Sequence, residues 1–175
     1  MNIIQKLIHL DRSISNHYTE KHDNSWHMFF SMISHSGSLA VIGTLIVCAM
    51  LLLYEYVVWP MMLIFFAELL GLLIIILLRH ATKRNRPRKL RPRWIDAWNK
   101  YSFPSHHACR AFIIASIMTL FYPTFMPLYY FWAMMIGYSR IYLLKHYFSD
   151  VVCGSLLGIS VGQGVCFYFL LNYSI

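Results

Sequence analysis

The chain has 175 residues, 58% of them hydrophobic and 13% charged, with a formal net charge of +8. That length allows one domain, and the apolar share exceeds the roughly 45–50% of soluble domains, which excludes an ordinary soluble protein. Eight of the fifteen Lys and Arg residues lie between Lys83 and Lys100, in a loop between apolar segments. A basic loop at a membrane surface meets lipid headgroups first, so we expect the bilayer as a partner and no nucleic-acid binding.

The first predicted element is an amphipathic helix over Asn2–Thr19, within an N-terminal segment of residues 1–24. Isoleucine and leucine recur there at helical spacing, but Lys6, Asp11 and Arg12 interrupt any apolar core. The segment is therefore not a signal peptide. We expect the helix to lie in the membrane interface, with a sixth, tilted span as the alternative.

Apolar segments of near-spanning length follow, and the two shortest need their polar flanks to reach across a bilayer. They are Leu39–Tyr54, Val57–Arg79, His107–Phe121, Thr124–Tyr138 and Val151–Leu171. The fold class predicted for residues 1–175 is thus a single all-α domain, a multi-pass transmembrane helical bundle of about five spans.

Small and acidic residues inside these spans predict how the helices pack. Gly154, Gly158 and Gly162 form a GxxxGxxxG ladder on the last span, which favours close helix–helix approach. Glu68 lies in the middle of the second span, where a carboxylate must face a partner or a cavity. A hydrogen bond to a neighbouring helix and a functional role both remain open for Glu68.

Each span must cross back, so alternate span ends share one membrane face. Three polar segments then meet on the same face: Arg79–Pro87, Phe103–His107 and Ser139–Asp150. Residues 80–105 form a basic loop that joins the first two segments. We therefore predict one site at this face, lined by all three segments.

A histidine and an aspartate in the third segment indicate a nucleophile. His146 and Asp150 are four residues apart, so on a helix they share one face. A carboxylate on one imidazole nitrogen fixes the tautomer and leaves the other nitrogen free to attack. A second histidine, His107, could protonate a leaving group, while Ser105 and backbone amides at the start of the third span add neutral donors.

Arginines complete the site. Arg79, Arg86 and Arg140 each offer a planar fork of donors, which suits an anion with several equivalent oxygens. Together with a nucleophile and an acid they favour phosphoryl transfer. The competing interpretation is a metal site with the ligands His106, His107, His146 and Asp150. Nearby arginines would repel a dication, so we predict no metal and no cofactor.

These segments resemble the motifs of the type 2 phosphatidic acid phosphatase superfamily, KxxxxxxRP, PSGH and SRxxxxxHxxxD, in that order. "SRIYLLKHYFSD" matches the third in full, and "PSHH" has His106 where the family has glycine. "RHATKRNRP" has Arg79 in place of the usual lysine, which directly ends a span. A register from Arg84 to Arg91–Pro92 has the same spacing and is the alternative. The resemblance covers roughly residues 57–171.

The resemblance implies a role for each of these residues. His146 would attack phosphorus and become phosphohistidine, Asp150 would orient it, and His107 would protonate the leaving oxygen. The phosphoryl oxygens would be held by Arg79, Arg86, Ser105, His106 and Arg140. His106 would act through its backbone amide, as the family's glycine does, so its imidazole should be dispensable unless the site is remodelled.

The function expected from this resemblance is a metal-independent lipid phosphatase. Its substrate would be a phosphate monoester or diphosphate of a membrane lipid: phosphatidic acid, phosphatidylglycerophosphate, undecaprenyl diphosphate or a lipid A phosphate. The alternatives are a vanadate-dependent haloperoxidase and a lipid-phosphate binding or transport protein. Positive charge places the site at the cytoplasm, whereas the family works on the outer face. We expect a bacterial inner (cytoplasmic) membrane with the site on the periplasmic or outer face.

Overall fold

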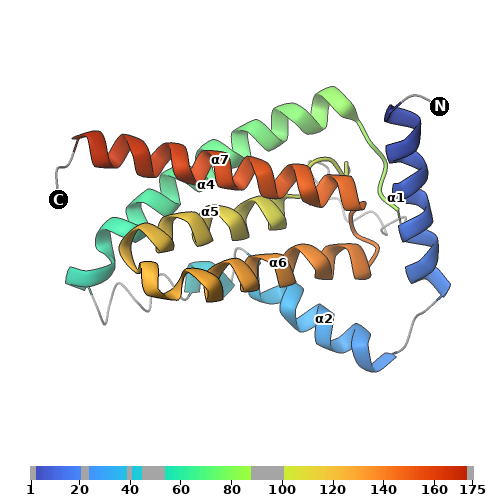
Figure 1. Cartoon of the computed structure of the whole chain (residues 1–175), viewed down its shortest axis with the longest axis horizontal. Helices are drawn as coiled ribbons and strands as arrows, with labels where there is room; N and C mark the ends of the chain where they lie inside the picture. The colour runs from blue at the N-terminus through green and yellow to red at the C-terminus, as the bar shows by residue number, and fades with distance from the viewer. Residues whose placement is uncertain (1–2, 21–23, 39–40, 45–53, 88–100, 173–175) are drawn as a thin grey trace.

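The computed structural model describes residues 3–20, 24–38, 41–44, 54–87 and 101–172. Its elements are α1 (Ile3–Glu20), α2 (Asn24–Ser36), α4 (Tyr54–Thr82), α5 (His106–Phe121), the 3₁₀ turn η2 (Pro123–Phe125), α6 (Met126–Tyr142) and α7 (Phe148–Asn172). In the described residues the fold is helical, as predicted. Figure 1 shows α5, α6 and α7 running side by side, with α4 slanting behind them and α1 lying across one end.

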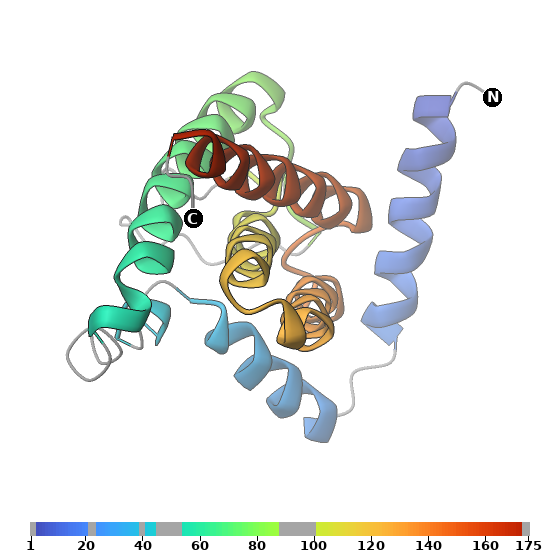
Figure 2. The same ribbon diagram turned by 60° about the vertical axis from the view of Figure 1, so that its left-hand side comes forward.

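Helix α5 is the centre of the bundle. It packs against α4, α6 and α7 (Figure 2). Its core-facing positions carry small side chains, and Ala108, Cys109, Ala111 and Ala115 are fully buried. Small residues let neighbouring helices approach closely, so α5 can be enclosed on several sides although it has only 16 residues.

The glycine ladder of α7 faces α5, which confirms the packing predicted for it. A Cβ atom at Gly154 would lie 2.4 Å from the Ser105 carbonyl oxygen, and one at Gly158 would lie 2.3 Å from the Cys109 carbonyl oxygen. Both distances are far below a van der Waals contact, so only glycine fits there. The contact matters for the site, because Ser105 belongs to the second motif.

Two helices in the described part of the chain are long and apolar enough to cross a membrane, residues 58–82 of α4 and the whole of α7. Helices α5 and α6 have 16 and 17 residues, below the roughly 20 that a span needs. Most of the first predicted span, Leu39–Tyr54, lies outside the described residues. The number of five spans therefore stays a prediction.

Helix α1 agrees with the N-terminal helix expected from the sequence. It lies across the end of the bundle rather than alongside the other helices (Figures 1 and 2), which favours an interfacial helix over a sixth span.

No element is predicted from the sequence over residues 25–38, yet α2 forms there and packs Phe30 and Ile33 against α6. Its Trp26, Phe29, Phe30 and Ile33 follow helical spacing, which is a signal for this helix.

Candidate active site

The three polar segments meet at one end of the bundle, as span parity predicts. Arg79 lies in the last turn of α4 and Ser105 directly precedes α5. Arg140 lies near the end of α6, and Asp150 in the first turn of α7. His146 lies in the short connection between α6 and α7. Helix ends thus bring together residues that are up to 71 positions apart, since 150 − 79 = 71.

The imidazole of His146 is buried and held by a backbone carbonyl. Its Nδ1 lies 2.7 Å from the Ser102 carbonyl oxygen. A carbonyl only accepts, so Nδ1 carries the hydrogen of the neutral ring and Nε2 keeps a lone pair. Asp150 Oδ2 lies 3.8 Å from Nδ1, beyond a hydrogen bond. The expectation that a carboxylate fixes this tautomer is therefore wrong in detail, because the Ser102 carbonyl does so.

The charge state of His146 follows from its surroundings. Burial lowers its pKa well below the ordinary value of 6.5, and the positive charges of Arg86, Arg140 and Arg79 lower the pKa further. The ring is thus kept neutral at pH 7. A neutral imidazole with a free Nε2 lone pair has the protonation state that a nucleophile requires.

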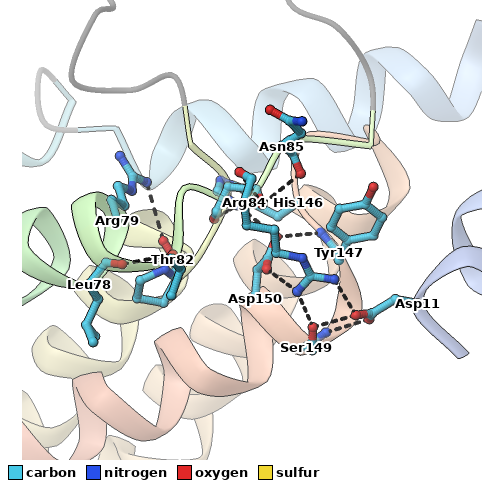
Figure 3. A network of polar contacts seen from close by, with 12 residues as sticks. Asp11, Leu78, Arg79, Thr82, Arg84, Asn85, His146, Tyr147, Ser149 and Asp150 are labelled. Atoms are coloured by element: carbon cyan, nitrogen blue, oxygen red, sulfur yellow. Dashed lines mark hydrogen bonds and ion pairs between the residues drawn. The ribbon is translucent and has the colours of Figure 1, made fainter. Parts of the chain in front are cut away.

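Asp150 is fully buried and supports the connection that carries His146. Its Oδ2 accepts the Tyr147 backbone N–H at 2.9 Å, and its Oδ1 accepts Arg84 Nη1 at 2.7 Å. Figure 3 shows Arg84 lying between Asp150 and Asp11. Among these contacts Asp150 therefore bonds to the backbone next to His146, at Tyr147, and not to the imidazole ring.

Arginines of the first and third motifs surround His146. Arg79 is 1% exposed and Arg140 is 6% exposed, while Arg86 donates to the Lys145 carbonyl oxygen at 3.1 Å. The Arg140 guanidinium also donates to the Ser34 hydroxyl of α2. Buried cations of this density repel one another, so the cluster is suited to a multiply charged anion.

Two buried donors at this end lack an acceptor among the described residues. They are Nε of Arg140 and the hydroxyl of Ser105. A buried donor without an acceptor is costly, and oxygen atoms of a bound anion would satisfy both.

Lys145, for which the sequence predicts no role, adds another cation to the site. Burial lowers its pKa to about 8, together with the positive charges of Arg140 and Arg86.

The two histidines of "PSHH" have different surroundings. His107 lies half-buried in the first turn of α5, where the positive charge of Arg140 acts on it. The His106 ring instead contacts Arg110 Nη2 at 3.2 Å and lies 3.7 Å from Glu68 Oε2. The predicted place of His106 among the phosphate ligands can thus hold only for its backbone amide.

Glu68 has the helix–helix partner that a mid-span carboxylate requires. Its Oε2 accepts Arg110 Nε of α5 at 2.8 Å, so of the two possibilities left open the packing one is found. Arg110 itself is missing from the residues singled out in the sequence. The signal for it was a lone cation four residues after His106, inside an otherwise apolar span facing the span of Glu68.

The surroundings of the first motif favour the register that begins at Arg79. Arg79 and Arg86 act electrostatically on His146, whereas the Arg84 guanidinium is neutralised by two carboxylates, Asp11 and Asp150. Arg91 and Pro92, which complete the alternative register, lie outside the described residues. Among the described residues, no three His, Cys, Asp or Glu side chains gather into a cluster of metal ligands.

Comparisons with known proteins agree with these motifs. Residues 11–173 match the family described as the PAP2 superfamily. A lipid A 1-phosphatase of Porphyromonas gingivalis is 39% identical over 79 residues, which are 43% of this chain and 17% of that protein. This chain therefore matches only a minor part of that relative's length.

Two solved structures share the fold. A transmembrane PAP2-type phosphatidylglycerolphosphate phosphatase from Bacillus subtilis has a TM-score of 0.75 at 23% identity, covering 96% of this chain and 87% of that one. LpxE from Aquifex aeolicus has a TM-score of 0.70 at 24% identity, and the match covers 91% of this chain and 93% of that one.

Proposed function

The chain belongs to the PAP2 superfamily, and from this premise we propose that it is a metal-independent lipid phosphatase acting through a phosphohistidine. The observation that carries the proposal is the neutral His146 inside a cluster of buried arginines. A binding protein needs the cations, but it does not need a nucleophile whose tautomer is fixed or a second histidine beside it.

In the proposed first step, Nε2 of His146 attacks phosphorus and the bond between phosphorus and the lipid oxygen breaks. His107 gives its proton to the departing oxygen. Arg79, Arg86 and Arg140 neutralise the charge on the three equatorial oxygens, and Ser105 and the first amides of α5 donate hydrogen bonds. In the second step a water gives its proton to His107 and attacks the phosphohistidine, which releases phosphate and restores His146.

The surface next to the site supports a lipid as the substrate. An apolar groove of about 690 Å³ lies between α4 and α7, lined by residues such as Phe66, Ile74, Leu157 and Val165. Ile74 precedes Arg79 by five residues, or about 7.5 Å along the helix axis. An acyl or prenyl chain in this groove would hold its phosphate at the level of the arginines.

The haloperoxidase alternative has little support, because those enzymes are generally soluble and this chain has helices long enough to span a membrane. We further propose a bacterial inner membrane, with the site on the periplasmic or outer face. Several cations of the basic face are accounted for by phosphate binding, which weakens the charge argument for the cytoplasmic side.

The test is phosphate release in detergent from pure phosphatidic acid, phosphatidylglycerophosphate, undecaprenyl diphosphate and lipid A phosphates. We expect release from at least one lipid, loss of release in His146→Ala, and wild-type release in His80→Ala, which changes an exposed histidine at the end of α4. Vanadate, which resembles the trigonal-bipyramidal phosphoryl group, should inhibit. Activity that EDTA abolishes and a divalent cation restores contradicts the metal-independent mechanism.

A further inference from the structure

Asp11 is a buried carboxylate on a helix with many exposed polar side chains. It is 2% exposed, while its neighbours Leu10 and Arg12 are exposed. Oδ1 accepts the Ser149 backbone N–H at 3.0 Å, and Oδ2 accepts the Ser149 hydroxyl at 2.6 Å. Oδ2 also accepts Arg84 Nη2 at 2.6 Å. Both oxygens are used, as a buried carboxylate requires, so α1 docks on the bundle through a specific contact.

Arg84, which contacts Asp11, also contacts residues of the third motif. Its Nη1 donates to Asp150 Oδ1 at 2.7 Å and to the Ser149 hydroxyl at 2.6 Å. Its guanidinium carbon lies 4.2 Å from the centre of the Tyr147 ring, a cation–π distance. Figure 3 shows Arg84 with Asp11 on one side, Asp150 on the other and Ser149 beside both. One guanidinium thus links α1 to the first turn of α7.

The backbone of Arg84 is also connected to His146, through hydrogen bonds of Ser102. The Arg84 carbonyl oxygen accepts the Ser102 backbone N–H at 2.8 Å. The Ser102 carbonyl oxygen in turn accepts His146 Nδ1. The side chain of Arg84 therefore holds Asp150, and its main chain holds the residue that fixes the His146 tautomer. A shift of Arg84 would disturb both supports of the nucleophile.

We propose that Asp11 is a positioning residue for His146, acting through Arg84, and that α1 is therefore part of the catalytic unit and not only a membrane anchor. This inference rests on the proposed function for the role of His146. Without the Asp11 carboxylate, Arg84 keeps only one of its two carboxylate partners. In Asp11→Asn one carboxylate oxygen becomes an NH2 group, so the Ser149 N–H and hydroxyl at the start of α7 no longer both have a carboxylate oxygen to donate to. Both changes loosen the geometry of the imidazole.

The experiment compares Asp11→Asn with Arg12→Gln, an exposed neighbour on the same helix. Steady-state kinetics use a lipid phosphate that the wild type hydrolyses. In Asp11→Asn we expect kcat to fall on the order of 10-fold to 10²-fold, the scale of a misplacement near 1 Å. KM should change little, because the arginines that bind phosphate remain. Arg12→Gln should match the wild type, and Asp11→Glu, which keeps the charge, should recover part of kcat.

A second measurement reads His146 directly. The ¹⁵N resonances of its imidazole, identified by their loss in His146→Gln, should show the hydrogen on Nδ1 in the wild type. In Asp11→Asn they should move towards a mixture of tautomers. A double-mutant cycle with Arg84→Lys should be non-additive in kcat, because Asp11 acts through Arg84.

The outcomes separate the two proposals. Unchanged His146 resonances in Asp11→Asn, or an additive cycle, overturn the positioning role of Asp11. A wild type that releases phosphate from no lipid overturns the proposed function, while the resonances still decide whether Asp11 positions His146. Full activity of His146→Ala overturns the nucleophile assignment alone.

Discussion

His106 and His107 are adjacent at the start of α5, yet their side chains have different surroundings. His107 lies where the positive charge of Arg140 acts on it. His106 turns instead to Arg110 and Glu68. A helix separates consecutive side chains by about 100°, so adjacent histidines can face different environments. Replacing each histidine in turn should therefore distinguish their roles.

The choice of leaving group tests His107 as the acid. A lipid alkoxide needs a proton to leave, whereas a phosphate leaving from a diphosphate, or p-nitrophenolate, needs it much less. His107→Ala should therefore lose more rate on monoesters than on diphosphates, by roughly the 10²-fold scale of acid catalysis. His106→Gly should keep activity, because the Glu68–Arg110 pair remains at 2.8 Å. An inactive His106→Gly beside an active His107→Ala would show that the motif is shifted by one residue.

The depressed pKa of His146 predicts how stability depends on pH. Its pKa in the fold lies well below 6.5, so below pH 6.5 the unfolded chain binds a proton that the folded chain does not. Stability is then lost as pH falls from about 6.5 towards the folded pKa. The unfolding temperature in detergent should fall less steeply between pH 7 and 5 in His146→Gln than in the wild type. The exposed His9→Gln serves as the control, and equal slopes in all three contradict the prediction.

At the scale of elements, the contact between α5 and α7 decides whether the second and third motifs share one site. The Ser105 backbone N–H donates to the Asp150 carbonyl oxygen at 2.9 Å. This bond is possible only because Gly154 lets the two helices approach. The helix that carries Asp150 and the residue that precedes α5 are therefore fixed to each other by backbone atoms.

Replacing glycines on α7 tests this contact. Gly154→Ala puts a methyl group 2.4 Å from the Ser105 carbonyl oxygen, which cannot move without breaking the helix start. Overpacking of this kind costs about 1–3 kcal/mol, so the unfolding temperature should fall and activity should fall with it. Gly164→Ala is the matched control, because nothing lies within 4 Å of the point that its methyl group would occupy. Equal stability of the two variants would count against the close approach.

At the scale of the whole molecule, a largely buried ion pair joins α4 to the central helix. Arg110 donates to Glu68 Oε2 at 2.8 Å and reaches the Gly37 carbonyl oxygen at 3.5 Å, just beyond α2. Three segments of the bundle thus meet at one guanidinium, about one helical turn after His107. Such a pair is costly to break and less costly to replace as a whole.

Replacing one residue of this pair and replacing both should therefore have different effects on stability. Glu68→Ala leaves the Arg110 charge buried and should cost about 3–5 kcal/mol of stability. The double variant Glu68→Leu/Arg110→Leu should be closer to the wild type than either Glu68→Leu or Arg110→Leu alone. Thermal unfolding in detergent measures all of these proteins. Additive losses would show that the two side chains do not interact.

Much of the fold could be predicted from apolar length and spacing alone, because the hydrophobic effect and backbone hydrogen bonding act locally along a helix. The predicted Val57–Arg79 and Val151–Leu171 lie within α4 and α7, and the N-terminal amphipathic pattern forms α1. The sequence pattern does not predict helix α2, because its apolar stripe is short and lies beside a longer apolar run.

The sequence by itself also predicted which motif residues come together, because successive helices with short connections run in opposite directions and so place alternate helix ends on the same side. Only the tertiary structure decided what each side chain contacts. His146 bonds to the carbonyl of Ser102, 44 residues away, and Ser149 bonds to Asp11, 138 residues away. Periodicity fixes the face of a helix but not its rotation and depth against distant segments. Those depend on packing, such as the approach at Gly154, and they set every distance in the site.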